Sequence, residues 1–301
     1  MHLLCALDGS EFSEWGVRFL EALASRPPEA VTLMHVIDTP TMKAATVTRP
    51  AAGKRAISAL EKAGTQLLHR MEGIAKVSLG QATTKPHTKI RTLLAHGSPA
   101  AAITKEARRR KTDVIVLGSR GLSDVQSFLL GSVSRKVSAL APCPVLVIKQ
   151  PLTRLEHVLL AVDSSKHSQG AAGFLYQRFL PNSARVTVLS VVEPLMTELA
   201  SKYFPVAQLT DLVKPKQEQT MRVVSHFRDL FLKEGYAVTT DVATDHVTDN
   251  ILKHAEKNKT DLLVAGSRGL TGSERLQLGS VSETLLKYAR CSVLIVRGWH
   301  A

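Results

Sequence analysis

The chain has 301 residues and a formal net charge of +13. Hydrophobic residues make up 44% of it and charged residues 22%, which is typical of a globular protein and excludes the disordered and collagen-like classes. No run approaches the roughly 18 apolar residues that a membrane-spanning helix needs. The N-terminal run Leu3–Leu7 is stopped by Asp8, too early for a secretory signal, and three scattered cysteines do not suggest a disulfide framework. These features predict a cytoplasmic protein.

Short apolar runs alternate with helical patterns along the chain. Because the runs are nearly continuous in Val, Ile and Leu, they favour strands buried on both faces of a parallel sheet. In the first half they are Leu3–Leu7, Val31–Ile37, Ile90–Leu94, Val114–Leu117 and Val145–Ile148. In the second half they are Val158–Val162, Val186–Val192, Ala237–Val242, Leu262–Ala265 and Val293–Val296.

Five strands alternating with four helices in each half predict an α/β fold. We expect two tandem doubly wound domains, each a five-stranded parallel sheet in the order 3-2-1-4-5 with helices on both faces. The boundary falls near Gln150–Arg154, which gives domains 1–150 and 151–301. Thr39–Gly53 and Pro194–Lys216 look like loops that either cover the ligand end of the sheet or simply connect elements. A helical face is expected at Ile57, Leu60, Ala63, Leu67, Met71 and Ile74.

The two halves share an internal duplication. Residues 112–137 and 260–285 align without gaps at an offset of 148, with 13 identities in 26 positions. Both segments contain the pattern G-x2-G-x9-G-S, in which the first glycine follows a predicted strand and the Gly-Ser pair opens a predicted helix. Glycines let a backbone approach phosphate oxygens closely, and a helix N-terminus attracts anions. The alternative is that the glycines serve turns and the serines cap helices.

Asp8 and Asp163 end the first strand of each half, at an offset of 155. Because the first and fourth strands are neighbours in the expected topology, these carboxylates should lie beside the glycine loops. They suit hydrogen bonding to a ribose or binding of a cation. Capping of the following helix is an equally good interpretation.

Taken together, these motifs resemble the universal stress protein family. The strand ending in Asp8-Gly9-Ser10, the segment His35–Asp38, the G-x2-G-x9-G-S loop and the closing strand from Pro142 carry the resemblance, which covers nearly the whole chain as two copies. The resemblance implies an ATP-binding regulatory protein of the stress response with one site per domain. It also implies a nucleotide accompanied by Mg²⁺, pairing of the two domains within the chain, further association into a homodimer and an unknown regulatory protein partner.

The family's nucleotide contacts map onto matching positions in both copies. In the first copy they imply Leu7, Asp8, Val36, Gly118, Arg120, Gly121, Gly131, Ser132, Val133 and Ser134. In the second copy they imply Val162, Asp163, Val191, Gly266, Arg268, Gly269, Gly279, Ser280, Val281 and Ser282. One departure is Asp245, which replaces Gly97 after the third strand. That strand should be an edge strand distant from the glycine loop, so a changed turn is expected rather than a lost site.

Two other functions stay open. One is a slow ATPase using the same loops, for which only Asp8 and Asp163 offer a general base, so no catalytic residue is assigned. The other is a module that binds acidic partners or nucleic acid, since residues 1–150 carry 21 Lys or Arg against 11 Asp or Glu. Nucleic acid is the less expected partner, because the sequence lacks the aromatic residues that stack single-stranded bases. His35 and His87 are expected to be packing or surface residues, and no metal ligands are assigned.

Overall fold

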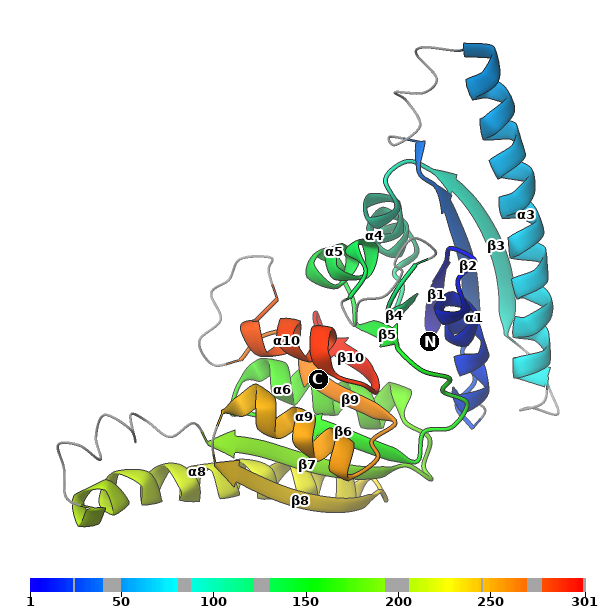
Figure 1. Cartoon of the computed structure of the whole chain (residues 1–301). Coiled ribbons are helices and arrows are strands. Elements are labelled where there is room, and N and C mark those ends of the chain that lie inside the picture. The colour runs from blue at the N-terminus through cyan, green and yellow to red at the C-terminus, as the bar shows by residue number, and fades with distance from the viewer. Residues whose placement is uncertain are drawn as a thin grey trace. The chain divides into compact units, whose positions relative to one another are not determined.

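The computed structural model describes residues 1–23, 25–39, 50–80, 88–121, 130–192, 206–244, 246–269 and 278–299, with the backbone alone at 50–52 and 206–216. The chain divides into two compact units, Met1–Arg154 and Leu155–Ala301 (Figure 1). Each unit is a doubly wound α/β domain, so the predicted fold class is confirmed.

The first unit alternates strands and helices. Its elements are β1 (His2–Leu7), α1 (Glu11–Arg18), the 3-10 helix η1 (Phe19–Leu23), β2 (Ala30–Ile37), α3 (Pro50–Gly80), β3 (Lys89–His96), α4 (Pro99–Arg110), β4 (Val114–Gly118), α5 (Ser132–Leu140) and β5 (Val145–Ile148). The strands form a parallel sheet in the order β3-β2-β1-β4-β5.

The second unit repeats this order. Its elements are β6 (His157–Ala161), α6 (Lys166–Phe174), the π-helix η2 (Leu175–Phe179), β7 (Arg185–Val192), α8 (Val206–Lys233), β8 (Ala237–Thr244), α9 (Val247–Lys257), β9 (Leu262–Gly266), α10 (Ser280–Tyr288) and β10 (Ser292–Val296). Its parallel sheet has the order β8-β7-β6-β9-β10.

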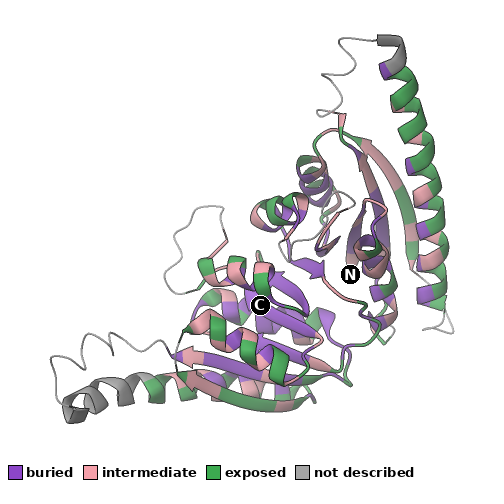
Figure 2. Ribbon diagram, in the orientation of Figure 1, coloured by how far each residue is buried: buried purple, intermediate pink, exposed green. Residues whose placement is uncertain are grey.

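Helices cover both faces of each sheet, so the central strands are the core. In the first unit α1 packs beside α3, and α4 packs beside α5. The central strands β4 and β9 are buried almost throughout, whereas the edge strands β3 and β8 have no buried residue and expose at least half of their residues (Figure 2). This contrast explains why the central strands read as continuous apolar runs.

The register of the central strands places the motifs at one end of the sheet. In β1, Leu3 pairs with Val114 and Cys5 with Val116 of β4. Asp8 and the glycine loop therefore both follow the carboxyl ends of adjacent strands. The second unit has the same arrangement, in which Ala161 pairs with Ala265. Such a switch point in strand order is where doubly wound sheets bind ligands.

Two predicted loops are shorter than expected. Helix α3 already begins at Pro50, inside the predicted loop Thr39–Gly53, and α8 begins at Val206, inside Pro194–Lys216. Proline suits the first turn of a helix, because its missing N–H has no helical partner there. Residues 40–49 and 193–205 lie outside the described residues, so whether they cover the ligand end stays untested.

The buried face of α3 differs in part from the predicted one. Met71 is fully buried as expected, but the other buried apolar side chains include Leu68 and Ala75, and Leu60 is 42% exposed. The prediction was wrong here because α3 is longer than the strands it covers. Its N-terminal end extends beyond the strands, as Figure 2 shows, and contact with the sheet includes Gly64, which packs against His35 and Leu94.

Candidate functional site

A cleft of about 270 Å³ opens at the carboxyl ends of β1, β2 and β4 in the first unit. All ten residues expected at the first site line it. On the side of β2 the cleft is apolar and is lined by Met34 and Val36. The other end is formed by the glycine loop and the start of α5. A cleft with one apolar and one polar end can hold an amphipathic small molecule.

The glycine loop is tied to the sheet at both of its ends. Ser119 N–H donates to the carbonyl of Ile148 in β5 at 2.8 Å, and Gly131 N–H donates to the carbonyl of Ser119 at 2.8 Å. The buried Ser134 hydroxyl donates to the carbonyl of Gly118 at 2.6 Å. These bonds fix the start of α5 next to the end of β4. Ser134 therefore has a structural role as well as a place on the cleft wall.

Two glycines of the first loop serve different purposes. A Cβ at Gly118 would lie 2.7 Å from the Cβ of Phe12 and 2.9 Å from its carbonyl carbon. This glycine thus allows α1 to pack against the end of β4. A Cβ at Gly121 would lie 2.7 Å from Oδ2 of Asp8, across the cleft wall. The structural interpretation of the motif holds for Gly118, while Gly121 keeps the cleft open beside a carboxylate.

The N-terminus of α5 has no side-chain cap. Its N-cap is Gly131, which has no side chain to accept from the first-turn N–H groups. In α1, by contrast, the Ser10 hydroxyl accepts a hydrogen bond from Ser13 N–H at 3.3 Å. The first-turn residues of α5, Ser132, Val133 and Ser134, all line the cleft. Uncapped N–H groups and the helix dipole make this end of the cleft suitable for an anion.

Asp8 is held by serine rather than acting as the cap itself. Its Oδ1 accepts from Ser10 N–H at 3.0 Å and from the Ser10 hydroxyl at 2.6 Å. The residue that caps α1 is therefore Ser10, and the alternative of an aspartate cap is wrong at this position. With Oδ1 engaged, Oδ2 is the atom that faces the glycine loop.

The sequence analysis did not predict that α4 forms one side of the cleft. Pro99 and Ile103 line the cleft, although the third strand was expected to lie far from the glycine loop. Strand β3 is indeed an edge strand, but the chain turns back at Gly97, whose φ is +124°, and α4 returns over the sheet. The spacing of Pro99 and Ile103, one helical turn apart, was the available signal. Asp245, the counterpart of Gly97, lies outside the described residues.

A second cleft, of about 370 Å³, occupies the same place in the second unit. Nine of the ten residues expected at the second site line it, and the exception is Gly279. That glycine is the N-cap of α10, where a Cβ would lie 3.3 Å from the Cα of Arg268. A Cβ at Gly269 would lie 2.9 Å from Oδ2 of Asp163, which repeats the arrangement in the first unit. Val247 and Ile251 of α9 form the missed side of this cleft.

The clefts differ at several equivalent positions. Leu117 of the first cleft is replaced by Ala265 in the second. The guanidinium of Arg120 lies 5.4 Å from the centre of the Phe12 ring, whereas His167 occupies the position of Phe12 in the second unit. Asp163 is also held differently: its Oδ1 accepts from the Ser168 hydroxyl at 2.6 Å. The clefts therefore share a backbone plan and differ in side-chain support.

His35, which was expected to be a packing or surface residue, packs between β1 and α3. The Nδ1–H of His35 donates to the carbonyl of Leu7 at 2.7 Å, and its ring packs against α3 at Gly64. The equivalent Ser190 donates to the carbonyl of Val162 at 2.9 Å. Both residues thus fasten the strand end that carries the aspartate. His87 lies outside the described residues.

Other reactive groups are scarce in the part of the chain that is described. No group of three His, Cys, Asp or Glu side chains there could hold a metal ion. Cys5, Cys143 and Cys291 are free and buried, and burial raises the pKa of the Cys5 thiol to about 12, so it stays protonated. Among the described helices, none is long and apolar enough to cross a bilayer.

Comparison with known proteins identifies the family. The profile of the universal stress protein family matches residues 1–149 and 154–297. The chain belongs to the universal stress protein family. The match occurs twice, so this is a tandem member.

Individual relatives agree with this assignment. The universal stress protein YxiE of Bacillus subtilis is 29% identical over 152 residues, which are 49% of this chain and 97% of that protein. A universal stress protein from Archaeoglobus fulgidus is similar in fold over 99% of this chain and 98% of its own, with 21% identity and a TM-score of 0.70. An Arabidopsis thaliana member of the family, solved with AMP bound, covers 47% of this chain and 90% of its own at 19% identity and a TM-score of 0.36.

Proposed function

We propose that each unit binds one adenine nucleotide, ATP, in its cleft and that the protein acts as a nucleotide-dependent regulator in the stress response. The observation that carries this proposal is the uncapped start of α5, together with its counterpart α10, at the glycine-lined end of each cleft. The phosphate groups of a nucleotide are among the anions that such a helix start can bind.

The two ends of the cleft match the two ends of a nucleotide. The apolar side chains of Met34, Val36 and Ile103 provide a surface on which a purine ring can be buried. The N–H groups of Ser132 and Val133 and the cation of Arg120 would hold phosphate oxygens. Asp8 lies between these groups, where its Oδ2 can accept hydrogen bonds from ribose hydroxyls.

The fit depends on space that glycine leaves. A Cβ at Gly121 would lie against the Asp8 carboxylate, so any other residue there would fill the middle of the cleft. The repeat of this feature at Gly269 and Asp163 favours a site in each unit. Mg²⁺, if it accompanies the nucleotide, would be held mainly by phosphate oxygens, because the described lining of each cleft includes a single carboxylate.

Binding is favoured over hydrolysis by the lining of the clefts. Among the described lining residues, Asp8 is the sole carboxylate of the first cleft and no histidine is present; Asp163 has the same position in the second. Oδ1 of each aspartate already accepts hydrogen bonds from serine. A hydrolytic water would therefore have one oxygen, Oδ2, as its base in each cleft. The output of a binding protein is instead a change in conformational populations.

The cytoplasm is the compartment that we propose for this protein. Three free cysteines are expected in a reducing environment.

The test is ATP stoichiometry by isothermal titration of the whole chain, together with mass spectrometry of nucleotide released on denaturation. The wild-type chain should bind two ATP. Ser132→Asp places a carboxylate in the first turn of α5, where it should favour the helix but repel phosphate. We expect one ATP per chain from Ser132→Asp, one from Ser280→Asp and none from the double variant.

Ser132→Asn is the matched control, because it has the size of Asp without the charge. It should keep two ATP per chain with at most a modest loss of affinity. Two ATP per chain in the double Asp variant, or no ATP bound by the wild-type chain, would overturn the proposal. Release of ADP, with turnover lost in Asp8→Asn, would favour the ATPase instead.

A further inference from the structure

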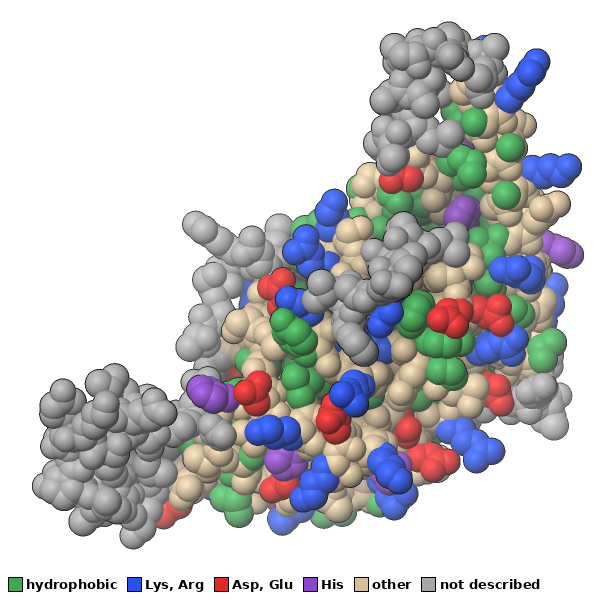
Figure 3. Space-filling model, viewed as in Figure 1, with side chains coloured by type: hydrophobic (Ala, Val, Ile, Leu, Met, Phe, Trp, Pro, Cys, Tyr) green, Lys and Arg blue, Asp and Glu red, His purple; other side chains and the backbone are tan. Residues whose placement is uncertain are grey.

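The face that α4 and α5 present in the first unit is strongly basic. Residues 99–111 and 132–140 carry seven Lys or Arg and one Glu, a net charge of +6. The corresponding residues 247–259 and 280–288 of the second unit carry four Lys and three Asp or Glu, a net charge of +1. Figure 3 shows Lys and Arg side chains over this part of the first unit. The exposed members, which we call the basic face, are Lys105, Arg108, Arg109, Lys111, Arg135 and Lys136.

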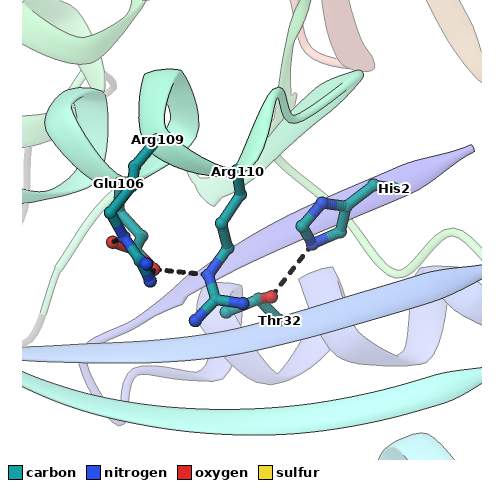
Figure 4. A network of polar contacts seen from close by, with 5 residues as sticks. All are labelled: His2, Thr32, Glu106, Arg109 and Arg110. Carbon is teal, nitrogen blue, oxygen red and sulfur yellow. Dashed lines mark hydrogen bonds and ion pairs between the residues drawn. The ribbon is translucent and has the colours of Figure 1, made fainter.

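Glu106, the one carboxylate on these two helices, already accepts hydrogen bonds from two arginines. Glu106 accepts from Arg109 at 2.7 and 2.8 Å and also from Nε of Arg110 (Figure 4). The neighbouring His2 side chain lies at 3.0 Å from the Thr32 hydroxyl and adds no negative charge. Of the basic face, only Arg109 takes part in an ion pair with a described residue. The other five cations are exposed to solvent.

The fold itself does not require these cations. Arg108 corresponds to Glu256 and Arg135 to Glu283 in the second unit, which has the same architecture. The helix dipole accounts for cations in the last turn of α4, but Arg135 and Lys136 are the fourth and fifth residues of α5. Arg135 lies at the end of the first turn, where a cation is at most mildly unfavourable, and Lys136 lies in the middle of this nine-residue helix. The dipole of α5 therefore does not account for these two cations.

The chemistry of the basic face points to one kind of partner. Protein interfaces centre on buried apolar or aromatic anchors, whereas α4 and α5 contain no aromatic residue and one exposed large apolar side chain, Leu140. Exposed cations that form no ion pair with a described residue, on helices without aromatic residues, suit phosphates that are bound without reading of bases. We propose that the basic face binds the phosphate backbone of double-stranded nucleic acid in a sequence-independent manner. This proposal does not depend on the nucleotide sites.

The experiment measures binding of the whole chain to a fluorescently labelled duplex of arbitrary sequence by anisotropy, at salt concentrations from about 50 to 200 mM. Five phosphate contacts predict a slope of about −4.5 in log K against log salt concentration. The double variant Arg108→Glu/Arg135→Glu introduces the residues that the second unit carries at these positions. We expect its affinity to fall about tenfold or more, with a slope less steep by about 2.

Lys253→Glu/Lys257→Glu is the matched control, since it makes the same change in net charge on the exposed side of α9. It should bind the duplex nearly as well as the wild-type chain. Equal losses in both double variants would show a general effect of net charge and would overturn the proposal. So would the absence of duplex binding at about 50 mM salt, or a poly-glutamate peptide that competes with the duplex at equal charge. ATP stoichiometry should be unchanged in Arg108→Glu/Arg135→Glu, which separates this test from that of the nucleotide sites.

Discussion

Oδ2 of Asp8 lies so close to Gly121 that a methyl group added to this glycine would be 2.7 Å from it. The two residues are 113 positions apart in the sequence and meet because β1 and β4 are neighbours. The same contact recurs between Asp163 and Gly269 at 2.9 Å. A carboxylate and a glycine in this relationship define the middle of each cleft.

Gly121→Ala should impair the first cleft without unfolding the unit. The added Cβ would displace the Asp8 carboxylate or the loop, since neither can accept a 2.7 Å contact. We expect ATP affinity at the first site to fall about tenfold, which is about 1.4 kcal/mol, while the melting temperature changes little. Titration calorimetry and thermal unfolding measure the two effects.

Gly73→Ala is the control for this substitution. Gly73 is an exposed position in α3, and no atom lies within 4 Å of a Cβ built there. Replacement by alanine should stabilise the helix by up to about 1 kcal/mol and leave ATP binding unchanged. Normal ATP affinity in Gly121→Ala would contradict the role given to the Asp8–Gly121 contact.

Gly118→Ala should act on stability instead. Here the added Cβ meets the backbone of Phe12 at 2.9 Å, and backbone cannot move aside cheaply. We expect a loss of about 1–3 kcal/mol in the free energy of unfolding, as for overpacked cores. Gly266→Ala, which meets the backbone of His167, should behave alike. Urea denaturation is the measurement, and an unchanged midpoint in both variants would rule out the packing role.

Serine substitutions should distinguish the two clefts. Ser10→Ala removes both the cap of α1 and the hydroxyl that donates to Asp8, so it should cost about 1 kcal/mol of stability and also weaken ATP binding at the first site. Ser165→Ala removes the cap of α6, but Asp163 keeps the hydroxyl of Ser168. It should therefore cost similar stability while ATP binding at the second site stays normal. Equal effects of both variants on binding would contradict this difference.

Glu106 should make stability depend on pH in the acid range. Hydrogen bonds from Arg109 and Arg110 lower the pKa of its carboxyl from 4.5 to about 2. A carboxyl whose pKa is lower in the folded than in the unfolded chain stabilises the folded state at any pH above its unfolded pKa. This stabilisation is lost as the pH falls through the pKa of the folded state. Glu106→Gln should therefore cost about 2 kcal/mol at neutral pH, since Arg109 is largely solvated, and much less near pH 2.

Chemical denaturation across the range from neutral pH to about pH 2 measures this dependence. Glu72→Gln is the control, because its pair with Lys76 is exposed and lies on one helix. It should cost only about 0.3–0.5 kcal/mol at neutral pH, so its pH dependence should be much smaller than that of Glu106→Gln. A pH-independent cost of Glu106→Gln would show that the ion pairs contribute little.

Much of the fold followed from the sequence because the strands of a buried parallel sheet are continuous apolar runs. Because β1 and β4 are parallel neighbours, their carboxyl ends lie side by side, which places Asp8 next to the glycine loop. The sequence could not show how far a helix extends beyond its sheet. Helix α3 begins at Pro50, and much of its N-terminal half is not buried in the core. The sequence there has no reason to show the apolar spacing that predicts a helix.

The side of the cleft that α4 forms was missed for a related reason. Strand order predicts where a strand ends, but the path of the following helix depends on tertiary packing. Pro99 and Ile103 reach the cleft because α4 crosses back over the sheet after Gly97. The sequence also could not show that Ser10 rather than Asp8 caps α1, because both residue types are good N-caps and the backbone position decides between them.

Every described residue that lines a cleft belongs to the same unit as that cleft. A damaging substitution in one cleft should therefore leave the other cleft intact within the same polypeptide. The two copies can change separately, and their surface charge already differs, with a net charge of +6 on α4 and α5 and the residues that end them against +1 on the corresponding residues of the second unit. We therefore expect a substitution in one half to cause a partial loss of function, and a full loss only when both halves are changed.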